Sequence, residues 1–227
     1  MINLKSIIIY LKAFLAFFVI GPFLLLVIII YPKSIYKLVV PFCQFMVYIF
    51  GCKIKVRGKF PNNESFVIMA NHASFLDVFA IPSVFKGKFS AVAASFNFKI
   101  PIYASFLKFL RIVPINRSNR EQAIAGIKQA EKVLKDGYHI VVLPEGTRTL
   151  TGALGKFKKG GFHLAKNTNA KILPVITEGL FEFKPKNRWT LKPGIINITI
   201  SEPINIDGKS VNELLQETES VFIKHLN

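Results

Sequence analysis

The sequence predicts an α/β fold in which a mostly parallel central sheet is flanked by helices and preceded by an N-terminal membrane-associated helical segment. From residue 51 onward, runs of strand length alternate with longer helical patterns, which is typical of a parallel sheet. Before that point the chain is strongly apolar and has no acidic residue. We therefore expect a membrane-embedded or interfacial helical motif over residues 1–50 and one α/β domain over residues 51–227.

The N-terminal segment contains an uncharged stretch, residues 13–31, that is long enough to cross a bilayer, and a second apolar stretch over 39–50. Pro22 lies in the first stretch and is expected to kink a helix there. A single span tends to have lysine on one side, but here both sides carry it, at Lys5, Lys12, Lys33 and Lys37. This favours a segment that enters one leaflet and returns, or a helical pair in the interface, with a single transmembrane helix as the alternative. No small-residue cleavage site follows, so we expect a retained anchor.

The elements of the α/β domain follow from the spacing of apolar residues. Alternation of polar and apolar residues predicts half-buried strands, and continuous apolar runs predict strands buried on both faces. These patterns place strands at residues 53–57, 66–70, 90–94, 139–143, 171–177 and 195–200, with an extended segment at 111–115. Helices are expected at 75–84, 102–110, 120–135 and 210–226. Asn119 can cap the third helix and Asp136-Gly137 can end it.

Charge and cysteine content limit the classes of partner. The formal net charge is +17, which indicates an anionic partner, and for a chain with this N-terminus anionic lipid headgroups fit best. A nucleic-acid partner is not expected, because the basic residues lack interleaved aromatics or a known binding motif. The only cysteines are Cys43 and Cys52, too few and too poorly spaced for a metal site or a disulfide framework.

The first candidate site follows the strand at 66–70. His72 is followed five positions later by Asp77, and a histidine held by a carboxylate is suited to accept a proton near neutral pH. Along a regular helix the two side chains would diverge, because five residues turn about 500°. They can converge if His72 lies in the turn before a helix and Asp77 in its first turn. The plain alternative is a core histidine beside a helix-capping aspartate.

The second candidate site follows the strand at 139–143. It contains Glu145, Gly146, Thr147 and Arg148. The glycine permits a tight turn and close approach of a ligand, and the guanidinium fork suits a phosphate. Glu145 is expected to accept a hydrogen bond from a substrate hydroxyl or to fix an arginine; a surface turn with a Glu–Arg ion pair is the alternative.

Two windows without acidic residues lie beside these candidate sites. They run between Asp77 and Glu121 and between Glu145 and Glu178, and both are rich in lysine and arginine. They indicate an anionic substrate. Arg117, which follows the extended segment at 111–115, is expected to bind phosphate together with Arg148.

On these motifs the chain resembles the glycerolipid acyltransferases, and most closely the bacterial 1-acylglycerol-3-phosphate acyltransferases. Residues 71–77 look like the first signature of that family, residues 115–117 like the second, 143–149 like the third and 173–176 like the fourth. Lys99 before Pro101 is similar to a family lysine that faces the site. The chain departs from the pattern at Asn116, where the family usually has an acid, and at Ala104-Ser105, where it often has glycine. The resemblance covers about residues 50–205.

The resemblance implies direct acyl transfer without a metal or cofactor. His72 would deprotonate the sn-2 hydroxyl of lysophosphatidic acid, and the oxygen would attack an acyl thioester carried by acyl-carrier protein or coenzyme A. Asp77 would orient and stabilise the imidazolium. Arg117, Arg148 and Lys99 would hold the phosphate, while Glu145, Gly146 and Thr147 would help to bind the acceptor. The implied location is the cell inner membrane, with the α/β domain on the cytoplasmic face and membrane lipids as partners.

Two other functions stay open at this point. An acyltransferase of the same fold could use another lysolipid, such as a lysophospholipid or a lyso-aminolipid. A non-catalytic scaffold that binds anionic lipid would explain the charge and the apolar N-terminus, but it would leave both candidate sites as coincidence. The sequence leaves acyl-chain length, the choice between the two thioester donors and the oligomeric state open.

Overall fold

The computed structural model describes residues 3–61, 64–116 and 118–226, and its described residues form one seven-stranded sheet in the order β1-β7-β6-β2-β5-β3-β4. The neighbouring pairs are parallel apart from β6 and β7, which are antiparallel. The strands are β1 (Lys53–Arg57), β2 (Val67–Ala70), β3 (Phe89–Ala94), β4 (Val113–Ile115), β5 (His139–Val142), β6 (Ile172–Glu178) and β7 (Ile195–Ile200). The α/β fold with a mostly parallel sheet is thus confirmed.

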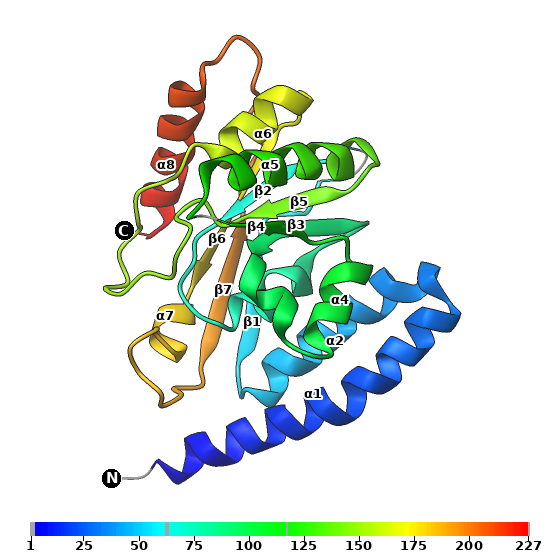
Figure 1. Ribbon diagram of the computed structural model, residues 1–227. Helices are drawn as coiled ribbons and strands as arrows, with labels where there is room; N and C mark the ends of the chain where they lie inside the picture. The colour runs from blue at the N-terminus through cyan, green and yellow to red at the C-terminus, as the bar shows by residue number, and fades with distance from the viewer. Residues whose placement is uncertain (1–2, 62–63, 117, 227) are drawn as a thin grey trace.

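Helices cover both faces of this sheet (Figure 1). On one face lie α5 (Arg120–Lys135), α6 (Gly160–Thr168) and α8 (Val211–Leu226). On the other lie α1 (Leu4–Ile30), α2 (Ile35–Ile49), α3 (Asp77–Ala80), α4 (Tyr103–Phe109) and α7 (Leu180–Phe183). Strand β2 contributes to both cores, because Val67 and Met69 join the first set of helices while Ile68 and Ala70 join the second. Burial on both faces explains its continuous apolar sequence.

Most predicted elements match the structure closely. Strands β1 and β7 and helix α5 have the expected bounds, and the Asn119 side chain caps α5 by accepting a hydrogen bond from the Gln122 amide at 3.0 Å. The helix expected at 75–84 is shorter: α3 ends at Ala80 and a 3₁₀ turn, Pro82–Val84, follows. Proline, which has no amide hydrogen, accounts for this break. Sequence analysis missed α6, α7 and the antiparallel direction of β7.

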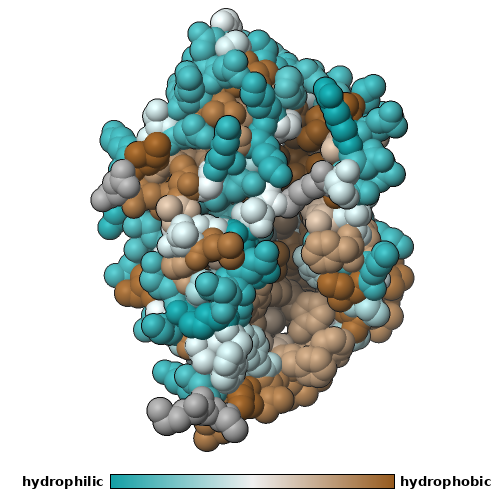
Figure 2. Space-filling view, turned by 60° about the vertical axis from the view of Figure 1, so that its left-hand side comes forward, coloured by the Kyte–Doolittle hydropathy of each residue, from teal (hydrophilic) through white to brown (hydrophobic). Residues whose placement is uncertain are grey.

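The N-terminal segment forms two helices that pack against each other, and its position relative to a membrane stays a prediction. Helix α1 continues through Pro22, so the expected kink does not end it, and the chain instead turns at the 3₁₀ segment Pro32–Ser34 before α2 returns. Helix α1 is long and apolar enough to cross a membrane, with a mean hydropathy of 3.0 over its most apolar window. Hydrophobic side chains gather along the edge of the molecule beside the N-terminus (Figure 2). This surface indicates that the protein associates with a membrane.

The helical pair is joined to the α/β domain by a common core. Ile28 of α1 and Met46 of α2 belong to the same buried cluster as Phe66 and Ile68 beside and within β2. The Leu191 amide, in the loop before β7, donates a hydrogen bond to the Ser6 hydroxyl of α1 at 2.9 Å. The hydrophobic core is therefore continuous across residue 50. The expected boundary between a helical motif and an α/β domain at this position stays a prediction.

We expect the turn between β6 and α7 to tolerate no side chain at Gly179. Its φ is +86°, and an added Cβ would lie 2.3 Å from the Ile195 carbonyl oxygen. Gly208 is the matched control, because its φ is +71° but an added Cβ would meet nothing within 4 Å. Left-handed backbone alone costs about 1–2 kcal/mol, or roughly 5 °C in Tm, in Gly208→Ala. Gly179→Ala should lower the Tm by about twice that or more; equal losses would contradict the close approach.

Candidate active site

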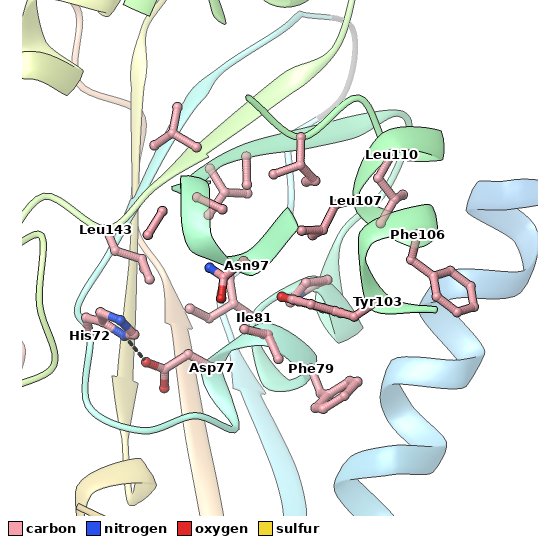
Figure 3. Close-up of a pocket in the computed structure, with 18 of the residues that line it drawn as sticks. His72, Asp77, Phe79, Ile81, Asn97, Tyr103, Phe106, Leu107, Leu110 and Leu143 are labelled. Atoms are coloured by element: carbon pink, nitrogen blue, oxygen red, sulfur yellow. Dashed lines mark hydrogen bonds and ion pairs between the residues drawn. The ribbon is translucent and has the colours of Figure 1, made fainter. Parts of the chain in front are cut away.

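The first candidate pair meets in a loop rather than along a helix. His72 follows the carboxyl end of β2, and Asp77 is the first residue of α3. The intervening turn brings His72 Nδ1 to 2.5 Å from Asp77 Oδ2, the contact drawn in Figure 3. Because Nδ1 faces the carboxylate, its proton is assigned there, and Nε2 is left to accept a proton from a substrate.

The Asp77 carboxylate is buried but well supplied with donors. Its residue is only 1% exposed. Oδ2 accepts a hydrogen bond from the Ala73 amide at 3.0 Å, and both oxygens lie 3.1 Å from the Ser74 amide nitrogen. Burial raises the pKa of the Asp77 carboxyl, while the hydrogen bonds from His72 and the two amides offset part of that shift. The carboxylate is therefore fixed in place beneath the imidazole.

The second candidate motif is bonded directly to His72. Glu145 Oε1 accepts a hydrogen bond from the His72 backbone amide at 2.7 Å, and the Thr149 amide donates to the His72 carbonyl at 2.9 Å. Both backbone groups of the histidine are thus held by residues 145–149, which follow β5. The two motifs, distant in sequence, lie side by side because β2 and β5 are neighbouring parallel strands.

Glu145 is held between two backbone amides. Its second oxygen, Oε2, accepts a hydrogen bond from the Gly155 amide at 2.8 Å, and the residue is only 5% exposed. With one oxygen on the His72 amide and the other on Gly155, Glu145 connects two loops and is not part of the cavity wall. These contacts give Glu145 a positioning role at His72, and the substrate contact expected from the sequence stays a prediction. Backbone amides carry no sequence signal, so these partners could not be predicted.

The other three residues of the motif border a cavity. Gly146 has a φ of +74°, as a tight turn requires, and Gly146, Thr147 and Arg148 line the same cavity as His72 and Asp77. The cavity has a volume of about 430 Å³. Figure 3 shows His72 and Asp77 at one end of this cavity, while its mostly apolar wall extends toward α4 and the N-terminal helices.

Of the predicted phosphate ligands, Lys99 is not among the residues that line this cavity. Lys99 ends the 3₁₀ turn Ser95–Lys99, where it is exposed, whereas Phe96 and Asn97 of the same turn line the cavity. Arg117 lies outside the described residues. The described residues also contain no group of three or more potential metal-binding side chains. The roles assigned to Lys99 and Arg117 stay predictions.

Sequence analysis missed two contributions to the site. Asn71 precedes His72, and its side chain donates to the Thr177 carbonyl and accepts from the Thr177 amide, both at 2.8 Å. This exchange ties the histidine loop to β6, the other neighbour of β2. Lys186, from the loop between α7 and β7, lines the cavity beside Arg148. A strand-end amide and a lysine-rich loop are too common to have identified either residue.

The burial of Glu145 leads to a testable pH dependence. Burial raises the pKa of its carboxyl, and the amides of His72 and Gly155 offset only part of the shift. Protonation of the Glu145 carboxyl therefore stabilises the folded state. This stabilisation is complete below the pKa of the unfolded chain, about 4.3, and is lost as the pH rises through the raised pKa of the folded protein. In thermal unfolding across this window, the Tm of the wild type should fall relative to that of Glu145→Gln as the pH increases. A constant difference between the two proteins would contradict the raised pKa.

Comparison with known proteins agrees with this architecture and these motifs. A family model described as Acyltransferase matches residues 53–178. The 1-acyl-sn-glycerol-3-phosphate acyltransferase of Pseudomonas aeruginosa is 29% identical over 229 residues, which cover 96% of this chain and 88% of that protein. The protein of the same name from Cocos nucifera is 28% identical over 187 residues, covering 81% of this chain. This chain spans 61% of the length of the Cocos nucifera protein.

A solved structure is similar over almost its whole length. The crystal structure of the 1-acyl-sn-glycerophosphate (LPA) acyltransferase PlsC from Thermotoga maritima matches this chain with a TM-score of 0.88 and 25% sequence identity. The match covers 99% of this chain and 95% of that one, and thus includes the N-terminal helices. Since the family model also spans more than half of the sequence, the chain belongs to the acyltransferase family, as its motifs indicate.

Proposed function

We propose that the protein transfers an acyl chain from acyl-carrier protein or acyl-CoA to the sn-2 hydroxyl of lysophosphatidic acid, giving phosphatidic acid. The observation that carries the proposal is the His72–Asp77 pair at the polar end of a largely apolar cavity that also exposes Arg148. The names of the relatives from Pseudomonas aeruginosa, Cocos nucifera and Thermotoga maritima support this choice of acceptor.

The proposed reaction follows from the free ring nitrogen of His72. Nε2 removes the proton of the acceptor hydroxyl as its oxygen attacks the thioester carbonyl carbon. The new C–O bond forms and the C–S bond breaks, and the imidazolium then returns the proton to the departing thiolate. Asp77 stabilises the imidazolium between these two transfers. The thioester is already activated, so this route uses no cofactor.

The substrates and location follow from the distribution of polarity. Arg148 is suited to hold the acceptor phosphate, and the apolar part of the cavity is suited to hold an acyl chain. The net charge of +17 favours an acidic carrier protein, the phosphates of coenzyme A, or anionic lipid headgroups. We place the protein at the cell inner membrane through α1 and α2, with the α/β domain on the cytoplasmic face.

The decisive experiment is acyl transfer in detergent from labelled acyl-CoA and labelled acyl-carrier protein. His72→Ala should reduce transfer to lysophosphatidic acid by about 10²- to 10⁴-fold, because the general base is lost. His163→Ala is the matched control, since His163 is exposed on α6, and it should keep wild-type activity. Both variants should still unfold in a cooperative thermal transition, which shows that they are folded at the assay temperature.

The same assay separates the remaining functions. Transfer by the wild type to another lysolipid, but not to lysophosphatidic acid, would replace the proposed acceptor while keeping the chemistry. Absence of transfer to every acceptor, or full activity in His72→Ala, would overturn the proposal.

The cavity predicts a second outcome, in acyl-chain preference. Ala93 of β3 lines the apolar part of the cavity, so Ala93→Phe would place a phenyl ring there. We expect the preference to move to shorter acyl donors, with long-chain transfer reduced most. Ala125→Phe is the control, because Ala125 is exposed on α5 across the sheet. An unchanged chain-length profile in Ala93→Phe would show that the acyl chain does not occupy this space.

A further inference from the structure

The loop between α7 and β7 brings a second group of cations to the active site. Residues 184–191 contain Lys184, Lys186 and Arg188 and no acidic residue. The loop lies outside the four family signatures, yet the Ser74 hydroxyl, within the first signature, donates a hydrogen bond to the Lys184 carbonyl at 2.9 Å. Its start is therefore attached directly to the loop that carries His72.

Arg188 has a structural task in this loop. Its guanidinium donates to the carbonyl oxygens of Thr190 at 3.0 Å, Phe183 at 2.8 Å and Glu182 at 2.5 Å. These hydrogen bonds connect the two ends of the loop through the Arg188 side chain. Three of the five guanidinium donors of Arg188 are thus used within the loop. Lys184 gives one hydrogen bond to the Pro185 carbonyl and has two donors left for a ligand.

The loop is also fixed at its far end. The Tyr10 hydroxyl of α1 donates to the Trp189 carbonyl at 2.8 Å, and the Leu191 amide donates to the Ser6 hydroxyl at 2.9 Å. Because both ends of the loop are held, the backbone that carries the lysines is positioned before any ligand arrives. A ligand that binds such a site pays little ordering entropy.

The cations at this site lack carboxylate partners. Ion pairs among the described residues join His72 to Asp77, Arg111 to Asp136, Lys171 to Glu64 and Lys209 to Glu217, so Lys184, Lys186 and Arg148 take part in none of them. The pKa of Lys184 lies below its ordinary value because of partial burial and the nearby charges of Arg148 and Arg188. Mutually repelling cations that form none of these ion pairs are suited to an anionic ligand.

We propose that Lys184 and Lys186 act with Arg148 as a binding site for a phosphate group of the substrate. Lys186 and Arg148 line the same cavity as His72, and Lys184 connects the loop to the histidine motif. The phosphate belongs either to the lysolipid acceptor or to coenzyme A. The inference rests on the proposed function and adds two substrate-binding residues that lie outside the family signatures.

Charge removal tests the proposal. In Lys184→Gln and Lys186→Gln the side chain stays polar but loses its charge. In each variant the KM for the phosphate-bearing substrate should rise about tenfold, as expected for one lost charge-assisted hydrogen bond. The kcat should change little, because neither lysine touches the reacting atoms. Lys192→Gln is the matched control: Lys192 is exposed just beyond the same loop and should leave both constants unchanged.

The choice of substrate identifies the source of the phosphate. A higher KM for lysophosphatidic acid with either donor assigns the site to the acceptor. A higher KM for acyl-CoA alone, with acyl-carrier protein and lysophosphatidic acid unaffected, assigns it to the nucleotide phosphates of coenzyme A. Unchanged KM values for every substrate in the folded double variant would overturn the proposal.

A binding measurement separates this inference from the proposed function. Trp189 is the only tryptophan of the chain and lies three residues from Lys186, so its fluorescence reports on the loop. Titration of the full-length protein in detergent with lysophosphatidic acid, and with the monoacylglycerol of the same chain, needs no turnover. A phosphate-dependent increase in affinity that the double variant loses would support the site even if the wild type transferred no acyl group. Where turnover assigns the site to the acceptor, equal affinities of wild type and double variant for lysophosphatidic acid would contradict it.

Discussion

The active-site geometry depends on two buried carboxylates whose partners are mainly backbone amides. Asp77 binds the amides of Ala73 and Ser74 together with the imidazole, and Glu145 binds the amides of His72 and Gly155. The loops that leave a parallel sheet have no neighbouring strand to satisfy their amides. A carboxylate buried among them gains hydrogen bonds that offset its own desolvation and also satisfies the amides. Removing either carboxylate would therefore remove a negative charge beside His72 and would also disturb the position of the histidine.

Strand order decides which loops can be joined in this way. Strand β2 lies between β5 and β6 and is parallel to both, so three loops leave the same edge of the sheet. The His72 loop is bonded on one side to the loop after β5, through Glu145 and Thr149, and on the other to Thr177 of β6, through Asn71. Motifs far apart in the sequence thus hold one histidine from two directions.

The sequence predicted what depends on local periodicity and failed where distant partners decide the structure. Helix α5 and strands β1 and β7 have clear apolar patterns, and their bounds agree with the structure. The direction of β7 depends on its pairing with β6, and the partners of Glu145 are amides that any residue supplies. Helix α6 starts with two glycines, Gly160 and Gly161, which disfavour a helix; packing supplies the compensation, since Phe162 and Leu164 are fully buried.

The arrangement of polarity around His72 gives a reason for the helical pair to share a core with the α/β domain. An amphiphilic substrate has its charged group at one end and its chain at the other, so a site that separates cations from apolar walls fixes its orientation. Here Arg148 and Lys186 border the cavity that His72 lines, and Phe17 and Phe42 of the N-terminal helices contribute apolar side chains to it. Helix α1 thus contributes to the apolar wall and, through Tyr10 and Ser6, holds the loop that carries Lys186. In the proposed reaction, the packing between these two ends would keep the acceptor hydroxyl at the boundary where the histidine lies.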